Sequence, residues 1–263
     1  MSSAAIPRLN IWLRTPWYRF WKVLETRAYE GREYCLQVPS GRRVYSPWFE
    51  MNPASDFTEA VKSIREAESG VLTADARFML YQFARQAVRL PGHMAECGVW
   101  TGGSAQLLAW IIDSGNTKEG TKLHLFDTFT GTPNTTVPDR DCDSPGSFGN
   151  TSLEGVKARL RQYAHFCHYH PGLIPDTFTE VAAISEYSLV HVDVDIYTAV
   201  MECCKWFWPR MTVGGAMVFN TYGAYPYRYS TRAAVDDFFA KETDKPIILP
   251  TAQAIAIKTA VNG

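Results

Sequence analysis

Residues 93–104 constrain the fold of this chain more than any other stretch, and they read HMAECGVWTGGS. Met94 to Cys97 is typical of the end of a short strand, and the three glycines that follow predict a tight turn. Glycine suits such a turn because its backbone takes positive φ freely and lets a ligand approach closely. We expect a helix to open at Ser104, with its hydroxyl as the N-cap.

The spacing within this turn favours one class of ligand over another. From Glu96 to Gly103 the pattern is E-x-G-x-x-x-G-G, whereas the dinucleotide-binding fingerprint is G-x-G-x-x-G. A nicotinamide-dependent oxidoreductase is therefore disfavoured. An acidic residue before a glycine turn suits a ligand with a cationic end, and a turn that binds no ligand is the structural alternative.

Strands and helices alternate along residues 56–263. The expected helices are Asp56–Ser69, Asp75–Leu90, one capped by Thr151 or Ser152 and running to Tyr163, Asp176–Ser185, Tyr197–Pro209 and Thr231–Glu242. Besides the strand at Met94, the expected strands are Lys122–Thr128, His165–Gly172, Ser188–Asp195, Gly214–Tyr222 and two short ones near 246–249 and 253–259. This alternation predicts an α/β fold, a doubly wound and mainly parallel sheet in a single domain.

The first 55 residues differ from that domain in composition. The first fifty hold eight Lys or Arg against four Glu, and Trp17, Phe20, Trp21 and Leu24 would share one face of a helix. We expect an N-terminal arm that packs on the domain or on a second subunit, with a homodimer favoured. A lid over the substrate site and a membrane-surface anchor are the alternatives.

Composition limits the partners of the chain. With a net charge of −1 over 263 residues, no overall field draws it to nucleic acid or to a membrane. Six cysteines without a C-x-x-C pair predict buried, reduced thiols in a cytoplasmic protein. No apolar run of 18 residues and no signal-peptide pattern is found, so neither a transmembrane segment nor secretion is expected.

Acidic side chains stand at the ends of three expected strands. They are Glu96 on the first, Asp127 on the second, and Asp193 with Asp195 on the fourth. Parallel strands bring their carboxyl ends to one edge of the sheet, where ligands of such folds bind. Period-two alternation predicts that His191, Asp193 and Asp195 point to one side. The long loop from Thr130 to Asn150 is expected to cover that site as a lid or switch.

Six segments of the chain, taken together, resemble one known family. In order, they are AECGVWTGGS, LFDTFTGTP, FGNTSLEGVKARL, PGLIPDTF, HVDVDIY and GGAMVFNTYG. Over roughly residues 70–240 they are similar to the macrocin O-methyltransferases, which use S-adenosylmethionine to methylate hydroxyls on sugars and aromatic parts of natural products. The resemblance implies the class I methyltransferase fold, a Rossmann-like seven-stranded sheet whose last strand runs antiparallel.

The resemblance also implies the residues that bind the cofactor. Thr73 would border its amino-acid end, Asp127 would hold the ribose hydroxyls, and Asp193 would adjoin the cofactor. The central cradle of the cofactor would be formed by Glu96, Gly98, Val99, Gly102 and Ser104. The corner around the ribose would be lined by Thr128, Phe129 and Gly131. Around the adenine and the lid would lie Ser152, Asp176 and Thr177.

Catalysis in the family relies on the D-x-D on strand four. The resemblance implies that Asp193 binds a divalent metal and that Asp195 is the candidate base. His191 is the next candidate if Asp195 is excluded. The other two metal ligands of the family are adjacent aspartates at the end of strand five, where this chain has Asn220 and Thr221. Asn220 still offers an amide oxygen, but the loss of two carboxylates disfavours Mg²⁺ binding. We therefore expect activity to survive chelation.

Two functions follow from these observations. The first is an S-adenosylmethionine-dependent O-methyltransferase that acts on a small acceptor in natural-product biosynthesis. The alternative is a catalytically impaired relative that binds the cofactor and serves a partner or regulatory role.

Overall fold

The computed structural model describes residues 56–64, 72–114, 120–134 and 143–260. The expected N-terminal arm, residues 1–55, lies outside these ranges. None of the helices in the described ranges is long and apolar enough to cross a membrane.

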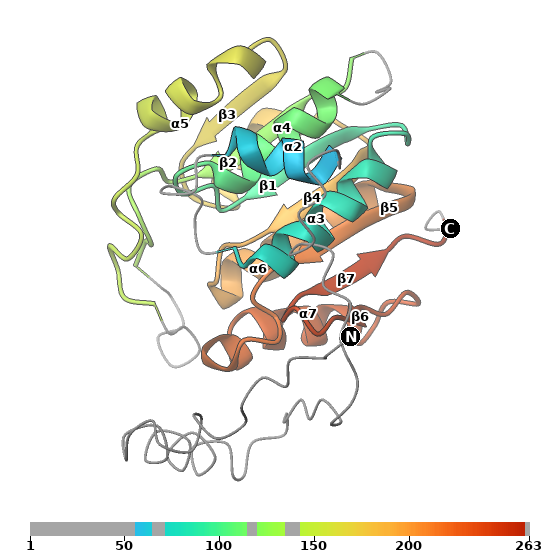
Figure 1. Cartoon of the computed structure of the whole chain (residues 1–263). Helices are drawn as coiled ribbons and strands as arrows, with labels where there is room; N and C mark the ends of the chain where they lie inside the picture. The colour runs from blue at the N-terminus through green and yellow to red at the C-terminus, as the bar shows by residue number, and fades with distance from the viewer. Residues whose placement is uncertain (1–55, 65–71, 115–119, 135–142, 261–263) are drawn as a thin grey trace, which may run out of the picture. The chain divides into compact units, whose positions relative to one another are not determined.

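Seven strands form one sheet (Figure 1). They are β1 (His93–Cys97), β2 (Leu123–Asp127), β3 (Cys167–Pro171), β4 (Tyr187–Val192), β5 (Met211–Phe219), β6 (Ile247–Ile248) and β7 (Ala254–Ile257). Their spatial order is β3-β2-β1-β4-β5-β7-β6. The first five strands pair in parallel, and β7 runs antiparallel to both β5 and β6. This confirms the expected doubly wound sheet of seven strands with an antiparallel last strand.

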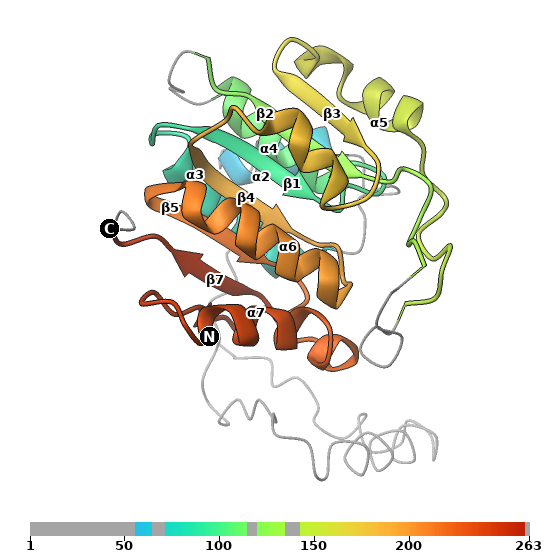
Figure 2. The same cartoon turned by 180° about the vertical axis from the view of Figure 1, so that it is seen from behind.

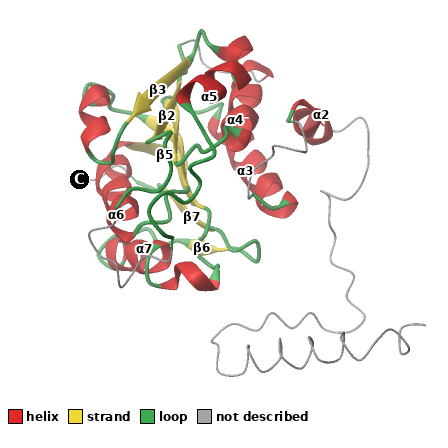
Figure 3. Ribbon diagram, turned by 90° about the vertical axis from the view of Figure 1, so that its left-hand side faces the viewer, coloured by secondary structure: helices red, strands yellow, loops and turns green. Residues whose placement is uncertain are grey.

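Helices cover both faces of the sheet, as the edge-on view shows (Figure 3). On one face lie α2 (Asp56–Ser63), α3 (Ala74–Ala87), α4 (Gly103–Ser114) and α5 (Leu153–Arg159). On the other lie α6 (Tyr197–Phe207), α7 (Thr231–Phe239) and the short 3₁₀-helix η4 (Asp176–Val181). Figure 2 shows α6 and α7 in front of the sheet.

Period-two alternation along the strands supplies one hydrophobic core on each face. Met94 and Leu189 pack on the side of α3 and α4, whereas Ala95 and Val190 pack on the side of α6 and α7. All four are fully buried. A parallel sheet is covered on both faces, so its strands are apolar nearly throughout. A buried polar residue in such a strand therefore requires a partner.

The strand expected to end at Asp195 ends earlier, at Val192. The amide of Asp193 still donates to the carbonyl of Cys97 at 2.8 Å, but the chain then turns and Asp195 has φ +57°. The expected extension of the strand through Asp195 is therefore wrong, because the two aspartates lie in a turn between β4 and α6. Gly98 permits this turn, since a Cβ there would lie 2.0 Å from the carbonyl oxygen of Asp193.

One expected N-cap is wrong, and the other is confirmed as Ser152 of the two candidates. Helix α4 begins at Gly103, and the amide of Gln106 donates to the carbonyl of Gly102 at 3.0 Å, so Ser104 lies in the first turn and is not the cap. Ser152 caps α5, accepting a hydrogen bond from the amide of Gly155 at 3.0 Å. Thr151 instead donates its hydroxyl to the carbonyl of Trp100, which ties this loop to the glycine turn.

Candidate active site

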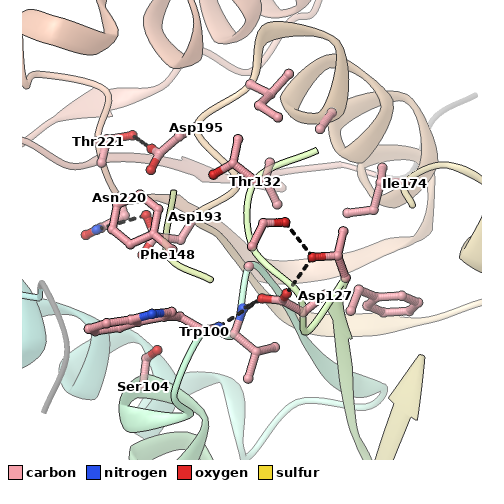
Figure 4. A pocket seen from close by; sticks show the side chains of 18 of the residues that line it. Trp100, Ser104, Asp127, Thr132, Phe148, Ile174, Asp193, Asp195, Asn220 and Thr221 are labelled. Atoms are coloured by element: carbon pink, nitrogen blue, oxygen red, sulfur yellow. Dashed lines mark hydrogen bonds between the residues drawn. The ribbon is translucent and has the colours of Figure 1, made fainter. Parts of the chain in front are cut away.

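A cavity of about 460 Å³ lies at the carboxyl ends of the parallel strands. The glycine turn after β1 and the end of β2 form one side of it, and the turns after β4 and β5 form the other (Figure 4). Part of the loop after β2 completes the wall. Cavities of this size are typical of sites for small molecules and cofactors.

The cavity brings together most of the residues that the sequence singled out. Those that line it are Thr73, Gly98, Val99, Ser104, Asp127, Thr128, Gly131, Asp193, Asp195, Asn220 and Thr221. These residues come from five separate segments of the chain, and convergence at one edge of the sheet is what a parallel topology imposes.

The other expected site residues do not line the cavity. Glu96 and His191 are fully buried in the strands beneath it. Gly102 and Phe129, both with positive φ, shape the adjoining turns, and Ser152 caps α5. In η4, Asp176 is exposed, while Thr177 is buried with its amide bonded to the carbonyl of Leu173.

Asp127 binds the glycine turn directly. One carboxylate oxygen accepts from the amides of Val99 at 2.6 Å and Trp100 at 2.8 Å. The other accepts from the amide of Phe129 at 2.7 Å. Thr128 Oγ1 also lies 3.4 Å from that second oxygen, but its single hydrogen is donated at the shorter distance of 2.7 Å to the carbonyl of Gly131. A carboxylate has about four good acceptor positions, so about one remains for a ligand. Asp127 therefore organises the glycine turn and keeps about one acceptor position for a ligand.

The two aspartates after β4 each receive a donor from the turn after β5. Asn220 Nδ2 donates to Asp193 Oδ1 at 3.1 Å, and Thr221 Oγ1 donates to Asp195 Oδ1 at 2.6 Å (Figure 4). Burial raises the pKa of Asp193 to about 6. Burial and the neighbouring charge of Asp193 raise the pKa of Asp195 well above its ordinary value, although the Thr221 hydroxyl opposes this. A carboxyl group with a raised pKa is suited to accept a proton near neutral pH.

Beneath the cavity, Glu96 and His191 form a buried pair. The two residues are register partners on β1 and β4, and His191 Nδ1 lies 2.7 Å from Glu96 Oε1. Burial alone would lower the pKa of His191, but the hydrogen bond and charge of Glu96, with the charge of Asp193, raise it. Glu96 Oε2 and His191 Nε2 have no hydrogen-bond partner among the described residues.

Trp100 and Phe148 line the cavity and were not predicted. Their rings meet edge to face at 5.9 Å, and both backbones have positive φ. Trp100 Nε1 also donates to Asn150 Oδ1 at 2.8 Å. The position of Trp100 inside the glycine turn was a signal in the sequence. Phe148 gave none, because it lies in a loop without periodicity.

The carboxylates that line the cavity are suited to S-adenosylmethionine. Asp127, Asp193 and Asp195 all line it, and a ligand with a positively charged sulfur is favoured where carboxylates are close and partly desolvated. The remaining acceptor position of Asp127 suits a hydroxyl of the ribose.

Comparison with known proteins identifies the family. The macrocin-O-methyltransferase (TylF) family model matches residues 76–253. The chain belongs to this family. The demethyldecarbamoylnovobiocin O-methyltransferase of Streptomyces niveus is 26% identical over 168 residues, which are 58% of this chain and 60% of that protein. The mycinamicin III 3''-O-methyltransferase of Micromonospora griseorubida is 26% identical over 144 residues, 51% of this chain and 56% of that protein.

The fold is shared with solved members of the class. The O-methyltransferase NovP superposes with a TM-score of 0.60 at 22% sequence identity, over 73% of this chain and 84% of NovP. This confirms the class I methyltransferase fold. The matches to the two curated relatives span less than two thirds of their lengths.

Proposed function

We propose that the chain is an S-adenosylmethionine-dependent O-methyltransferase that acts on a hydroxyl of a small sugar-containing or aromatic natural product. One observation carries this proposal: the glycine turn and the carboxylate of Asp195 line the same cavity. The names of the two curated relatives, a demethyldecarbamoylnovobiocin O-methyltransferase and a mycinamicin III 3''-O-methyltransferase, support the acceptor class.

When bound, S-adenosylmethionine would supply a methyl group on a cationic sulfur, which an acceptor oxygen takes up as the neutral thioether leaves. We assign Gly98, Val99 and Ser104 to the cofactor side, with Asp127 toward the ribose. We assign Thr73, Thr128 and Gly131, which also line the cavity, to the same side. We assign supporting roles to the expected site residues that do not line the cavity, which are Glu96, Gly102, Phe129, Ser152, Asp176 and Thr177.

An alcohol is a weak nucleophile at neutral pH, so a protein group must take its proton as the oxygen attacks. Asp195 is our choice for this base, because it lines the cavity and its pKa is raised. His191 is buried beneath the lining, and we assign it to holding Glu96. The site then orients the acceptor oxygen toward the methyl group and excludes water.

Two measurements test the proposal. Calorimetry with S-adenosylhomocysteine should show binding, whereas NADH should not bind. Methyl transfer from labelled S-adenosylmethionine should then be detected with at least one member of a panel of hydroxylated glycosides and phenols. Binding without transfer to any acceptor would favour the catalytically impaired relative. Binding of NADH in place of S-adenosylhomocysteine would refute the cofactor assignment.

We also expect a cytoplasmic homodimer. The four described cysteines, Cys97, Cys167, Cys203 and Cys204, are buried free thiols, which supports a reducing compartment. Light scattering of the full chain, compared with a chain that begins at residue 56, would measure the oligomeric state and the contribution of the arm.

A further inference from the structure

The residues after β5 offer hydrogen-bond donors where the family pattern implies metal-binding carboxylates. Asn220 Nδ2 and Thr221 Oγ1 both donate, each to a different aspartate of the D-x-D turn. Figure 4 shows the two pairs, Asn220 with Asp193 and Thr221 with Asp195, on the same side of the cavity. Each contact is a direct one between side chains.

A buried glutamine fixes the orientation of the Asn220 amide. Gln253 is fully buried just before β7, and its Nε2 donates to the carbonyl of Ala76 at 3.2 Å and to Asn220 Oδ1 at 3.5 Å. Thr251 donates to Gln253 Oε1 at 2.8 Å, so the Gln253 amide cannot rotate by half a turn without losing these hydrogen bonds. A reversed Asn220 would set its NH₂ group against that of Gln253. Its oxygen is therefore held away from Asp193.

The hydroxyl of Thr221 is held in a similar way. It lies 3.0 Å from the hydroxyl of Thr231, at the start of α7, as well as 2.6 Å from Asp195. Since Thr221 gives its hydrogen to the carboxylate, Thr231 is the donor in the second contact. Both the hydrogen and one lone pair of the Thr221 hydroxyl are then engaged within the protein.

This donor set does not fit magnesium. Mg²⁺ requires near-octahedral oxygen ligands and is held in proteins mainly by carboxylates. Among the four side chains of the two turns, only Asp193 and Asp195 carry carboxylates, and each already accepts a hydrogen bond. In the described part of the chain, no three Asp, Glu, His or Cys side chains are grouped so that they could hold a metal.

We propose that Asn220 and Thr221 are positioning residues that hold Asp193 and Asp195 by hydrogen bonds, in place of a metal ion, for methyl transfer at this cavity. The proposal rests on the proposed function and extends it to how the carboxylates are oriented. Asp195 Oδ1 is fixed by Thr221, and its second oxygen has no partner among the described residues, so it is the atom that receives the acceptor's proton. Asp193 is fixed by the Asn220 amide, which in turn depends on Gln253.

The first experiment measures metal affinity and needs no acceptor. The S-adenosylhomocysteine complex is titrated with Mn²⁺, followed by electron paramagnetic resonance, for the wild type and for the double variant Asn220→Asp/Thr221→Asp. We expect binding weaker than about 1 mM in the wild type and at least about tenfold tighter in the double variant, because two carboxylates are restored. Tight binding to the wild type, or equally weak binding to a folded double variant, would overturn the proposal.

The second experiment measures the positioning role of Thr221. Thr221→Val preserves shape and removes the donor, whereas Thr221→Ser keeps the hydroxyl. We expect Val to lower kcat about tenfold or more with KM and S-adenosylhomocysteine affinity within about twofold, and Ser to restore most of the loss. Turnover should also be unchanged after extensive treatment with a chelator. An unchanged kcat in the Val variant, or loss with a chelator that Mg²⁺ restores, would contradict the proposal.

These outcomes are separable from failure of the proposed function. A protein that binds S-adenosylhomocysteine but methylates no acceptor would refute the activity, while the Mn²⁺ titration would still decide whether Asn220 and Thr221 replace a metal.

Discussion

The side chain of Asp127, at the end of β2, accepts a hydrogen bond of 2.6 Å from the backbone amide of Val99 in the glycine turn. The same oxygen accepts from the amide of Trp100. One carboxylate therefore joins the ends of two adjacent strands and sets the shape of the turn between β1 and α4. It has a structural role whether or not a ligand is bound.

Asp127→Ala should therefore affect both cofactor affinity and stability. Binding of S-adenosylhomocysteine should weaken by roughly 1.5–3 kcal/mol, the scale of hydrogen bonds to a charged group. The melting temperature should also fall, because three amides lose their acceptor. Calorimetry and thermal unfolding measure the two effects. Asp113→Ala, an exposed aspartate on α4, is the control. Unchanged affinity in a folded Asp127→Ala variant would exclude Asp127 as a cofactor ligand.

Asp195→Asn should separate catalysis from folding. The residue has φ +57°, which asparagine tolerates better than most side chains, and the amide oxygen can still accept from Thr221. Turnover should fall about 10²–10⁴-fold, and affinity for S-adenosylhomocysteine should stay within about twofold. A variant that turns over at the wild-type rate would exclude Asp195 as the base.

The convergence of acidic residues could be predicted from the sequence, because parallel strands bring their carboxyl ends to one edge. Asp127 and Asp195 were located this way, and the fold class followed from the alternation of strands and helices. These inferences need only local patterns and one topological rule.

Contacts between distant segments could not be predicted in this way. The pairing of Glu96 with His191 depends on the register of two strands across 95 residues. The orientation of Asn220 depends on Gln253, which lies 33 residues later. The turn that ends β4 before Asp193 was also missed, because the apolar and acidic residues alternate through it as they would in a strand.

The raised pKa values of the two aspartates predict opposite effects of pH on activity and stability. Burial raises the pKa of Asp193 to about 6, and burial with repulsion from Asp193 raises the pKa of Asp195 well above its ordinary value. With Asp195 as the proposed base, turnover requires its ionised form. The acid limb of the pH–rate profile should therefore lie above about pH 4, where an ordinary aspartate would place it. The rate measured from pH 4 to 9 checks this.

The stability effect has the reverse sign. A carboxyl group whose pKa is higher in the folded than in the unfolded protein stabilises the fold in its protonated form. This stabilisation is fully present below about pH 4, the unfolded pKa, and is lost as the pH rises through the folded pKa. The Asp195→Asn variant has no carboxylate to bury at this position, so it should melt at a higher temperature than the wild type at pH 8. The difference between the two melting temperatures should narrow toward pH 4. A gap that is independent of pH would contradict the raised pKa.

Trp100 should hold the described part of the loop after β2, which lines the cavity. Trp100→Phe keeps a ring against Phe148 but loses the hydrogen bond to Asn150. Hydrogen exchange at Gly146, whose amide bonds to the carbonyl of Thr132, should accelerate about two- to tenfold, as one lost hydrogen bond allows. Trp110→Phe makes the same change on α4 and should leave this amide unaffected. Equal exchange in both variants would show that the indole does not hold the loop.

The buried pair of Glu96 and His191 tests whether a supporting residue also serves the cofactor. Glu96→Ala leaves His191 without its carboxylate and should cost about 3–5 kcal/mol of unfolding free energy, the usual effect of breaking a buried ion pair. The double variant Glu96→Met/His191→Phe replaces both partners with apolar groups, and such replacements are often neutral. It should regain most of the lost stability in urea unfolding. If Glu96 contributes to the cofactor cradle, S-adenosylhomocysteine affinity should remain weak in the double variant despite the recovered stability. Recovery of affinity together with stability would show that Glu96 acts only through the fold.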